Sequence, residues 1–153
     1  MQKLILSVLL TSLLFTISKA QNSKEKIGIS KNGKLVITSS LKKIKNEWAE
    51  ILKDQQIVVD LIDYSIVKGI DSGSNNRIYY MLLGKNVVST VKVATKLRLL
   101  NKTFYLPNYK KTDNLTVTCS GTKYLCNPQI FEGNWICGKN CSIECKKSVT
   151  VKE

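Results

Sequence analysis

The cysteines constrain this chain most, because all five lie in its C-terminal part, at Cys119, Cys126, Cys137, Cys141 and Cys145. The segment from Gly121 to Lys146 holds few aliphatic residues and several glycines and asparagines. Such a segment cannot fold around a hydrophobic core of its own, and disulfides replace the core in many small exported domains. The cysteines therefore predict a disulfide-stapled tail, residues 119–147, attached to a body formed by the rest of the chain.

Five cysteines allow two bridges and leave one thiol unpaired, and the spacing does not determine which residues pair. A zinc site is the main alternative, because four thiolates can hold zinc. Structural zinc sites usually contain Cys-x2-Cys pairs, whereas Cys137, Cys141 and Cys145 are separated by three residues each. No histidine is present to complete a mixed site. We therefore expect disulfides, with no bound metal and no cofactor.

The first 20 residues have the pattern of a cleavable secretory signal peptide. Lys3 precedes an apolar run from Leu4 to Ile17, and the small residues Ser18 and Ala20 precede the expected cleavage point. This run is shorter than the roughly 20 apolar residues that a membrane-spanning helix needs, and no later segment is comparable. We expect residues 1–20 to be removed and residues 21–153 to form one periplasmic or extracellular domain without a transmembrane segment.

The chain is strongly basic, with 24 lysines and arginines against 11 acidic residues and a net charge of +13. An excess of this size attracts polyanions. Export would separate the protein from intracellular nucleic acid. The partner that charge predicts is therefore an anionic glycan, a lipid surface or an acidic protein.

Hydrophobic periodicity predicts an α+β fold with an N-terminal hairpin, one amphipathic helix and an antiparallel meander of about five strands. Asn32-Gly33 between alternating apolar residues of 26–38 is a strong hairpin signal. Apolar residues then recur at helical spacing, which predicts a helix from Ser40 to Lys53 with Trp48 in the core. Period-two patterns or short apolar runs predict the meander strands at 62–66, 78–83, 91–99, 103–106 and 115–120.

One group of cations has a defined direction in this scheme. Alternation places Lys92, Lys96 and Arg98 on one face of the strand at 91–99, and Lys102 follows in the next turn. These four residues are candidates for anion binding. The alternative is an exposed sheet face or a guarded edge, which natural sheets often line with lysine.

The sequence contains no catalytic motif. The absence of histidine excludes Ser-His-Asp and Cys-His catalysis, and no glycine-rich phosphate loop is present. Carboxylate pairs of the glycosidase kind could be formed by Asp60 with Asp63 or by Glu47 with Glu50, although solvated surface charge is the simpler interpretation. We therefore expect a non-enzymatic protein without catalytic residues.

Four stretches of the chain form a combined pattern: residues 18–21, Lys68-Gly69, residues 79–84 and the tail from Thr118 through Trp135 to Lys147. In these stretches the chain resembles small exported cysteine-rich proteins of Bacteroidetes-type bacteria. The resemblance implies export and no particular activity. The sequence thus predicts an exported binding domain. The alternatives are a secreted carboxylate-dependent hydrolase of wall or glycan polymers and a periplasmic inhibitor or immunity-type protein.

Overall fold

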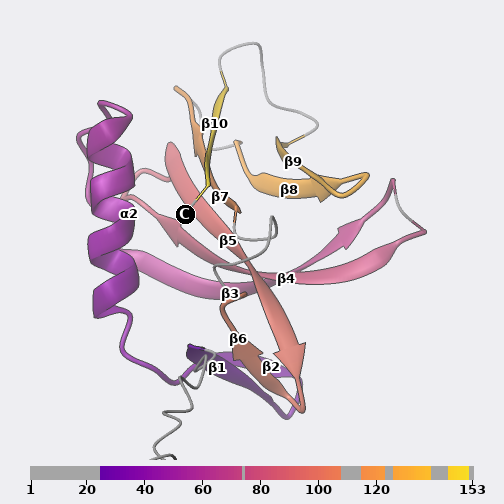
Figure 1. The fold of residues 1–153 in the computed structure, drawn as a ribbon. Coiled ribbons are helices and arrows are strands. Elements are labelled where there is room, and N and C mark those ends of the chain that lie inside the picture. Colours follow the sequence, from indigo (N-terminus) through magenta and orange to yellow (C-terminus); the bar gives the residue numbers. More distant parts are fainter. Residues whose placement is uncertain (1–24, 74, 108–114, 123–125, 139–144, 152–153) are drawn as a thin grey trace, which may run out of the picture.

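The computed structural model describes residues 25–73, 75–107, 115–122, 126–138 and 145–151. These residues form an α+β arrangement of mostly antiparallel strands with one helix, α2 (Lys42–Asp54) (Figure 1). Within them the strands are β1 (Lys26–Lys31), β2 (Lys34–Ile37), β3 (Asp63–Asp71), β4 (Arg77–Lys85), β5 (Val91–Leu100), β6 (Thr103–Tyr105), β7 (Leu115–Ser120), β8 (Pro128–Phe131), β9 (Asn134–Cys137) and β10 (Lys146–Val151). Of the last three, β8 and β9 lie in the cysteine-rich tail and β10 begins at its end, and periodicity predicted none of them. The expected signal peptide lies outside the described residues.

Strand β5 is the centre of the main sheet. Eight strands form this sheet in the order β10-β7-β5-β6-β1-β2, with β4 paired to both β5 and β3. The first part of β5 pairs with β4 and β7, and its last residues, Arg98–Leu100, pair with β6. The arrangement is therefore more complex than a simple meander, because β7 returns to the start of β5 and β10 pairs with β7.

The strands β1 and β2 form a hairpin at one end of this sheet. Their ladder runs from Gly28 opposite Ile37 to Lys31 opposite Lys34. Asn32 and Gly33 between them both have positive φ, 50° and 75°, as a type I′ turn requires. Strand β1 also pairs with β6, so the hairpin continues the sheet beyond the end of β5.

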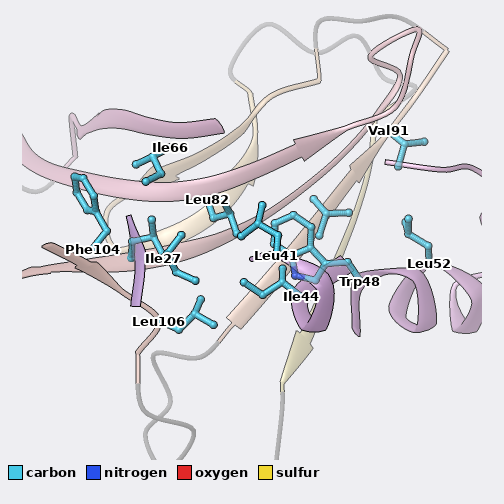
Figure 2. Close-up of a cluster of buried hydrophobic side chains, with 12 residues drawn as sticks. Ile27, Leu41, Ile44, Trp48, Leu52, Ile66, Leu82, Val91, Phe104 and Leu106 are labelled. Carbon is cyan, nitrogen blue, oxygen red and sulfur yellow. The ribbon is translucent and has the colours of Figure 1, made fainter. Parts of the chain in front are cut away.

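Helix α2 packs against one face of the sheet. The side of the helix that contacts the sheet is the apolar side predicted from the spacing of its hydrophobic residues. Ile44, Trp48 and Leu52 are buried there, four residues apart, in a core that also holds Leu82 and Phe104 (Figure 2). The helix runs from Lys42 to Asp54, close to the predicted range. Within the described residues, no helix is long and apolar enough to cross a bilayer.

The opposite face of the sheet is covered by the β8–β9 hairpin. Ile130 and Trp135 of this hairpin are buried in a second core that includes Tyr79, Ala94 and Val117 of the sheet. In Figure 1 the hairpin lies at the end of the sheet remote from β1, β2 and β6. The tail therefore has no core of its own, as its composition predicted, but completes one with the sheet.

Candidate functional site

Two disulfides fasten the tail to the sheet. Cys119 of β7 is joined to Cys137 of β9, with Cα atoms 5.6 Å apart, and Cys126 is joined to Cys145, with Cα atoms 6.0 Å apart. The prediction of disulfide bonds in the tail is thus confirmed, and the structure supplies the pairing that spacing left open. Cys141 lies outside the described residues.

A buried carboxylate also holds the β8–β9 hairpin in place. Asp71, at the end of β3, is 6% exposed. Its Oδ1 accepts the Glu132 and Gly73 backbone N–H groups at 2.7 and 3.3 Å, and its Oδ2 accepts the Gly133 N–H at 2.9 Å. Charge-assisted bonds of this kind are stronger than neutral ones. Asp71 therefore joins the far end of β3 to the hairpin turn, a long-range role that the local sequence did not indicate.

The hairpin divides the predicted anion-binding residues into two groups. Lys92 is only 5% exposed, and its Nζ donates a hydrogen bond to Asn127 Oδ1 at 2.6 Å. Lys96 and Arg98 are exposed. The expectation that Lys92 shares their open surface is wrong, because the tail packs over the start of β5 and leaves its second half uncovered.

The structure adds a cation that the sequence analysis missed. Arg98 lies directly opposite Tyr105 of β6, and Tyr105 lies opposite Lys26 of β1. Directly opposite residues share a face of the sheet, so these three side chains form a row across three strands. Lys96 is one step back along β5 on the same face, and Lys102 is exposed in the turn that follows.

We call Lys26, Lys96, Arg98, Lys102 and Tyr105 the basic face. None of its four cations forms an ion pair with an acidic residue that the structure describes. Strands β1, β2, β5 and β6 contain no aspartate or glutamate at all. The charged side chains of these four strands are therefore all positive.

The carboxylates considered for hydrolysis are arranged differently from a glycosidase pair. Glu47 and Glu50 line a cavity of about 180 Å³ between α2 and the sheet, and Glu47 Oε1 lies 3.9 Å from Lys43 Nζ. Both come from one wall, whereas glycosidase carboxylates flank the scissile bond. Asp63 pairs with Lys85 at 3.0 Å, and Asp60 is exposed. Among the residues that the structure describes, the sheet side of this cavity is lined by threonines and Val151 and offers no facing carboxylate.

Metal ligands do not gather in the described ranges, where no three cysteine, aspartate or glutamate side chains form a candidate site. No protein-family model, curated protein or solved structure matches the chain. The basic face is therefore assessed from its own geometry and charge.

Tyr79 makes the stability of the second core sensitive to alkaline pH. Its hydroxyl accepts the Ile130 N–H at 3.1 Å. Burial raises the pKa of Tyr79 above its ordinary value of 10.0; the hydrogen bond from Ile130 opposes this shift, and the charge of Asp71 adds to it. The folded protein thus holds this proton more tightly than the unfolded chain does.

We expect Tyr79 to make its full contribution to the free energy of unfolding below pH 10. That contribution should be lost as the pH rises through the pKa of Tyr79 in the folded protein. Tyr79→Phe should make that alkaline loss smaller, which urea unfolding on either side of pH 10 would measure. Burial also raises the pKa of Tyr64, so part of the loss should persist. An identical alkaline loss in the variant and the wild type would contradict this assignment.

Proposed function

We propose that this chain is an exported binding domain that holds an anionic partner on the basic face. The observation that carries the proposal is the row of Arg98, Tyr105 and Lys26 across three strands, with Lys96 beside it and no acidic residue in these strands. Cations without counterions attract anions at long range and bind them at short range. The amphipathic Tyr105 ring offers an additional contact within the row.

Export is supported by the two disulfides, because such bridges persist in oxidising compartments. A binding role rather than catalysis is supported by the absence of histidine and by the carboxylates of the cavity, which among the described residues all come from α2. Strand β6 pairs with both β5 and β1, which holds the three strands of the row together. A preformed face loses less conformational entropy when its partner binds.

The variant Lys96→Gln/Arg98→Gln tests this proposal. We expect it to elute from a heparin column at a clearly lower salt concentration than the wild type, because two exposed cations of one face are lost. The matched control is Lys42→Gln/Lys53→Gln, which removes the same charge from exposed positions of α2. The control should change elution much less. Equal shifts in both variants would mean that overall charge, and not this face, retains the protein.

A further inference from the structure

Three aliphatic side chains and one threonine form a row beside the cations on the same side of the sheet, which we call the apolar row. Leu100 lies opposite Thr103, Thr103 lies opposite Ile29, and Ile29 lies opposite Val36. The row therefore crosses all four strands β5, β6, β1 and β2, a width of about 14 Å at the usual spacing between strands.

This row is not part of the core. Leu99 lies opposite Phe104, which is completely buried on the helix side of the sheet. Because side chains alternate along a strand, the neighbouring Leu100 points to the other side. Leu100 and Val36 are each 41% exposed. We call this side of the four strands the outer face.

Cations border the apolar row on both sides. On one side is the row of Arg98, Tyr105 and Lys26. Arg98 lies two residues before Leu100 in β5, and Tyr105 lies two residues after Thr103 in β6. The register of β1 and β6 shifts between Lys26 and Gly28, and this irregularity brings Lys26 onto the outer face. On the other side Lys31 lies opposite Lys34, one step beyond the apolar row towards the hairpin turn.

The outer face thus combines exposed aliphatic side chains with cations and contains no carboxylate. A soluble polyanionic glycan would contact the cations but offers no apolar surface against which the aliphatic side chains could be buried. A second copy of the chain would bring two cationic faces together, which like-charge repulsion opposes. A bilayer with anionic headgroups offers both complements, since peripheral proteins bind it through apolar burial at the interface and through lysine and arginine.

We propose that the outer face binds to the surface of an anionic lipid bilayer. Leu100 and Val36 would then enter the boundary between the headgroups and the acyl chains. The cations of both flanks contact the lipid phosphates. This inference rests on the proposed function and names the class of its partner.

Vesicle sedimentation tests the apolar contribution. The wild type should bind vesicles of phosphatidylglycerol and phosphatidylcholine, and should bind much less to phosphatidylcholine alone. Val36→Thr/Leu100→Thr should weaken binding to the anionic vesicles about tenfold or more, because both side chains lose apolar area that the interface buries. Threonine suits strands, so the fold should persist, and thermal unfolding would verify it.

The matched control is Val87→Thr/Val88→Thr. These valines are 76% and 63% exposed in the turn between β4 and β5, outside the outer face. The control should bind anionic vesicles as the wild type does, and neither threonine variant should alter heparin retention. Lys96→Gln/Arg98→Gln should weaken both kinds of binding.

Two results would overturn the lipid inference while leaving the proposed function intact. One is retention on heparin without binding to anionic vesicles, which would indicate a soluble polyanion as the partner. The other is vesicle binding that Val36→Thr/Leu100→Thr leaves unchanged, which would indicate attraction by charge alone. Failure to bind either heparin or vesicles would overturn the proposed function as well.

Discussion

Removing the Cys119–Cys137 bridge with Cys119→Ala/Cys137→Ala is expected to lower the free energy of unfolding by about 3 kcal/mol. The bridge closes a loop across 18 positions of sequence and joins β7 to β9. Without it the unfolded chain regains the entropy of that loop, and the hairpin loses a covalent link to the sheet. Urea unfolding of the oxidised proteins would measure the difference.

Reductant provides the control for this prediction. With all bridges reduced, the wild type and the double variant should have similar stabilities, because the crosslink is then missing from both. A difference below about 1 kcal/mol between the oxidised proteins would show that the bridge contributes little beyond the contacts of Asp71 and the second core.

Trp48→Ala is expected to lower the free energy of unfolding by about 3–5 kcal/mol. Trp48 is 3% exposed and joins the helix to the sheet. Its ring stacks on that of Tyr64 with centroids 5.9 Å apart. It also occupies the space beside Gly84, where an added Cβ would lie 2.7 Å from Trp48 Cζ3. No smaller side chain fills this space, so the variant creates a cavity between the two layers.

Glu50→Ala is the control for the tryptophan variant, because Glu50 is exposed on the same helix. It should change stability by no more than about 0.5 kcal/mol. Chemical denaturation followed by far-ultraviolet circular dichroism would compare the two variants. A loss below about 1 kcal/mol for Trp48→Ala would mean that α2 docks mainly through Ile44 and Leu52.

The two halves of β5 explain why one end of the sheet is exposed on the side of the tail. The β8–β9 hairpin packs over the first half, where Ala94 is buried and Lys92 bonds to Asn127. The second half extends past the hairpin and pairs with β6. The same strand therefore supplies a structural lysine at one end and exposed cations at the other.

Local periodicity was sufficient to predict the helix and most of the body strands. The apolar spacing around Trp48 has the period of a helix, and β7 was predicted with the observed bounds, Leu115–Ser120. The tail strands were missed because β8 and β9 are four residues each and β10 is mostly polar. These strands are held in place by the disulfides and, for β10, by pairing with the distant strand β7.

The candidate site was only partly predictable for the same reason. Alternation along β5 correctly placed Lys96 and Arg98 on one side of the strand, since that depends on neighbouring residues alone. Lys26 lies more than seventy positions earlier in the chain, and only the pairing of β1 with β6 brings it to Tyr105. The burial of Lys92 likewise depends on a hairpin that comes later in the chain.

The sequence by itself determined the amphipathic helix, the alternating strands, the excess of positive charge and the need for crosslinks in a tail without its own core. Each of these follows from local spacing or composition. The tertiary structure decided which cysteines pair, which lysine is buried and which cations share a face with Leu100 and Val36. Those outcomes depend on strand register and on which face a distant segment covers, and neither is encoded in the period of a single stretch.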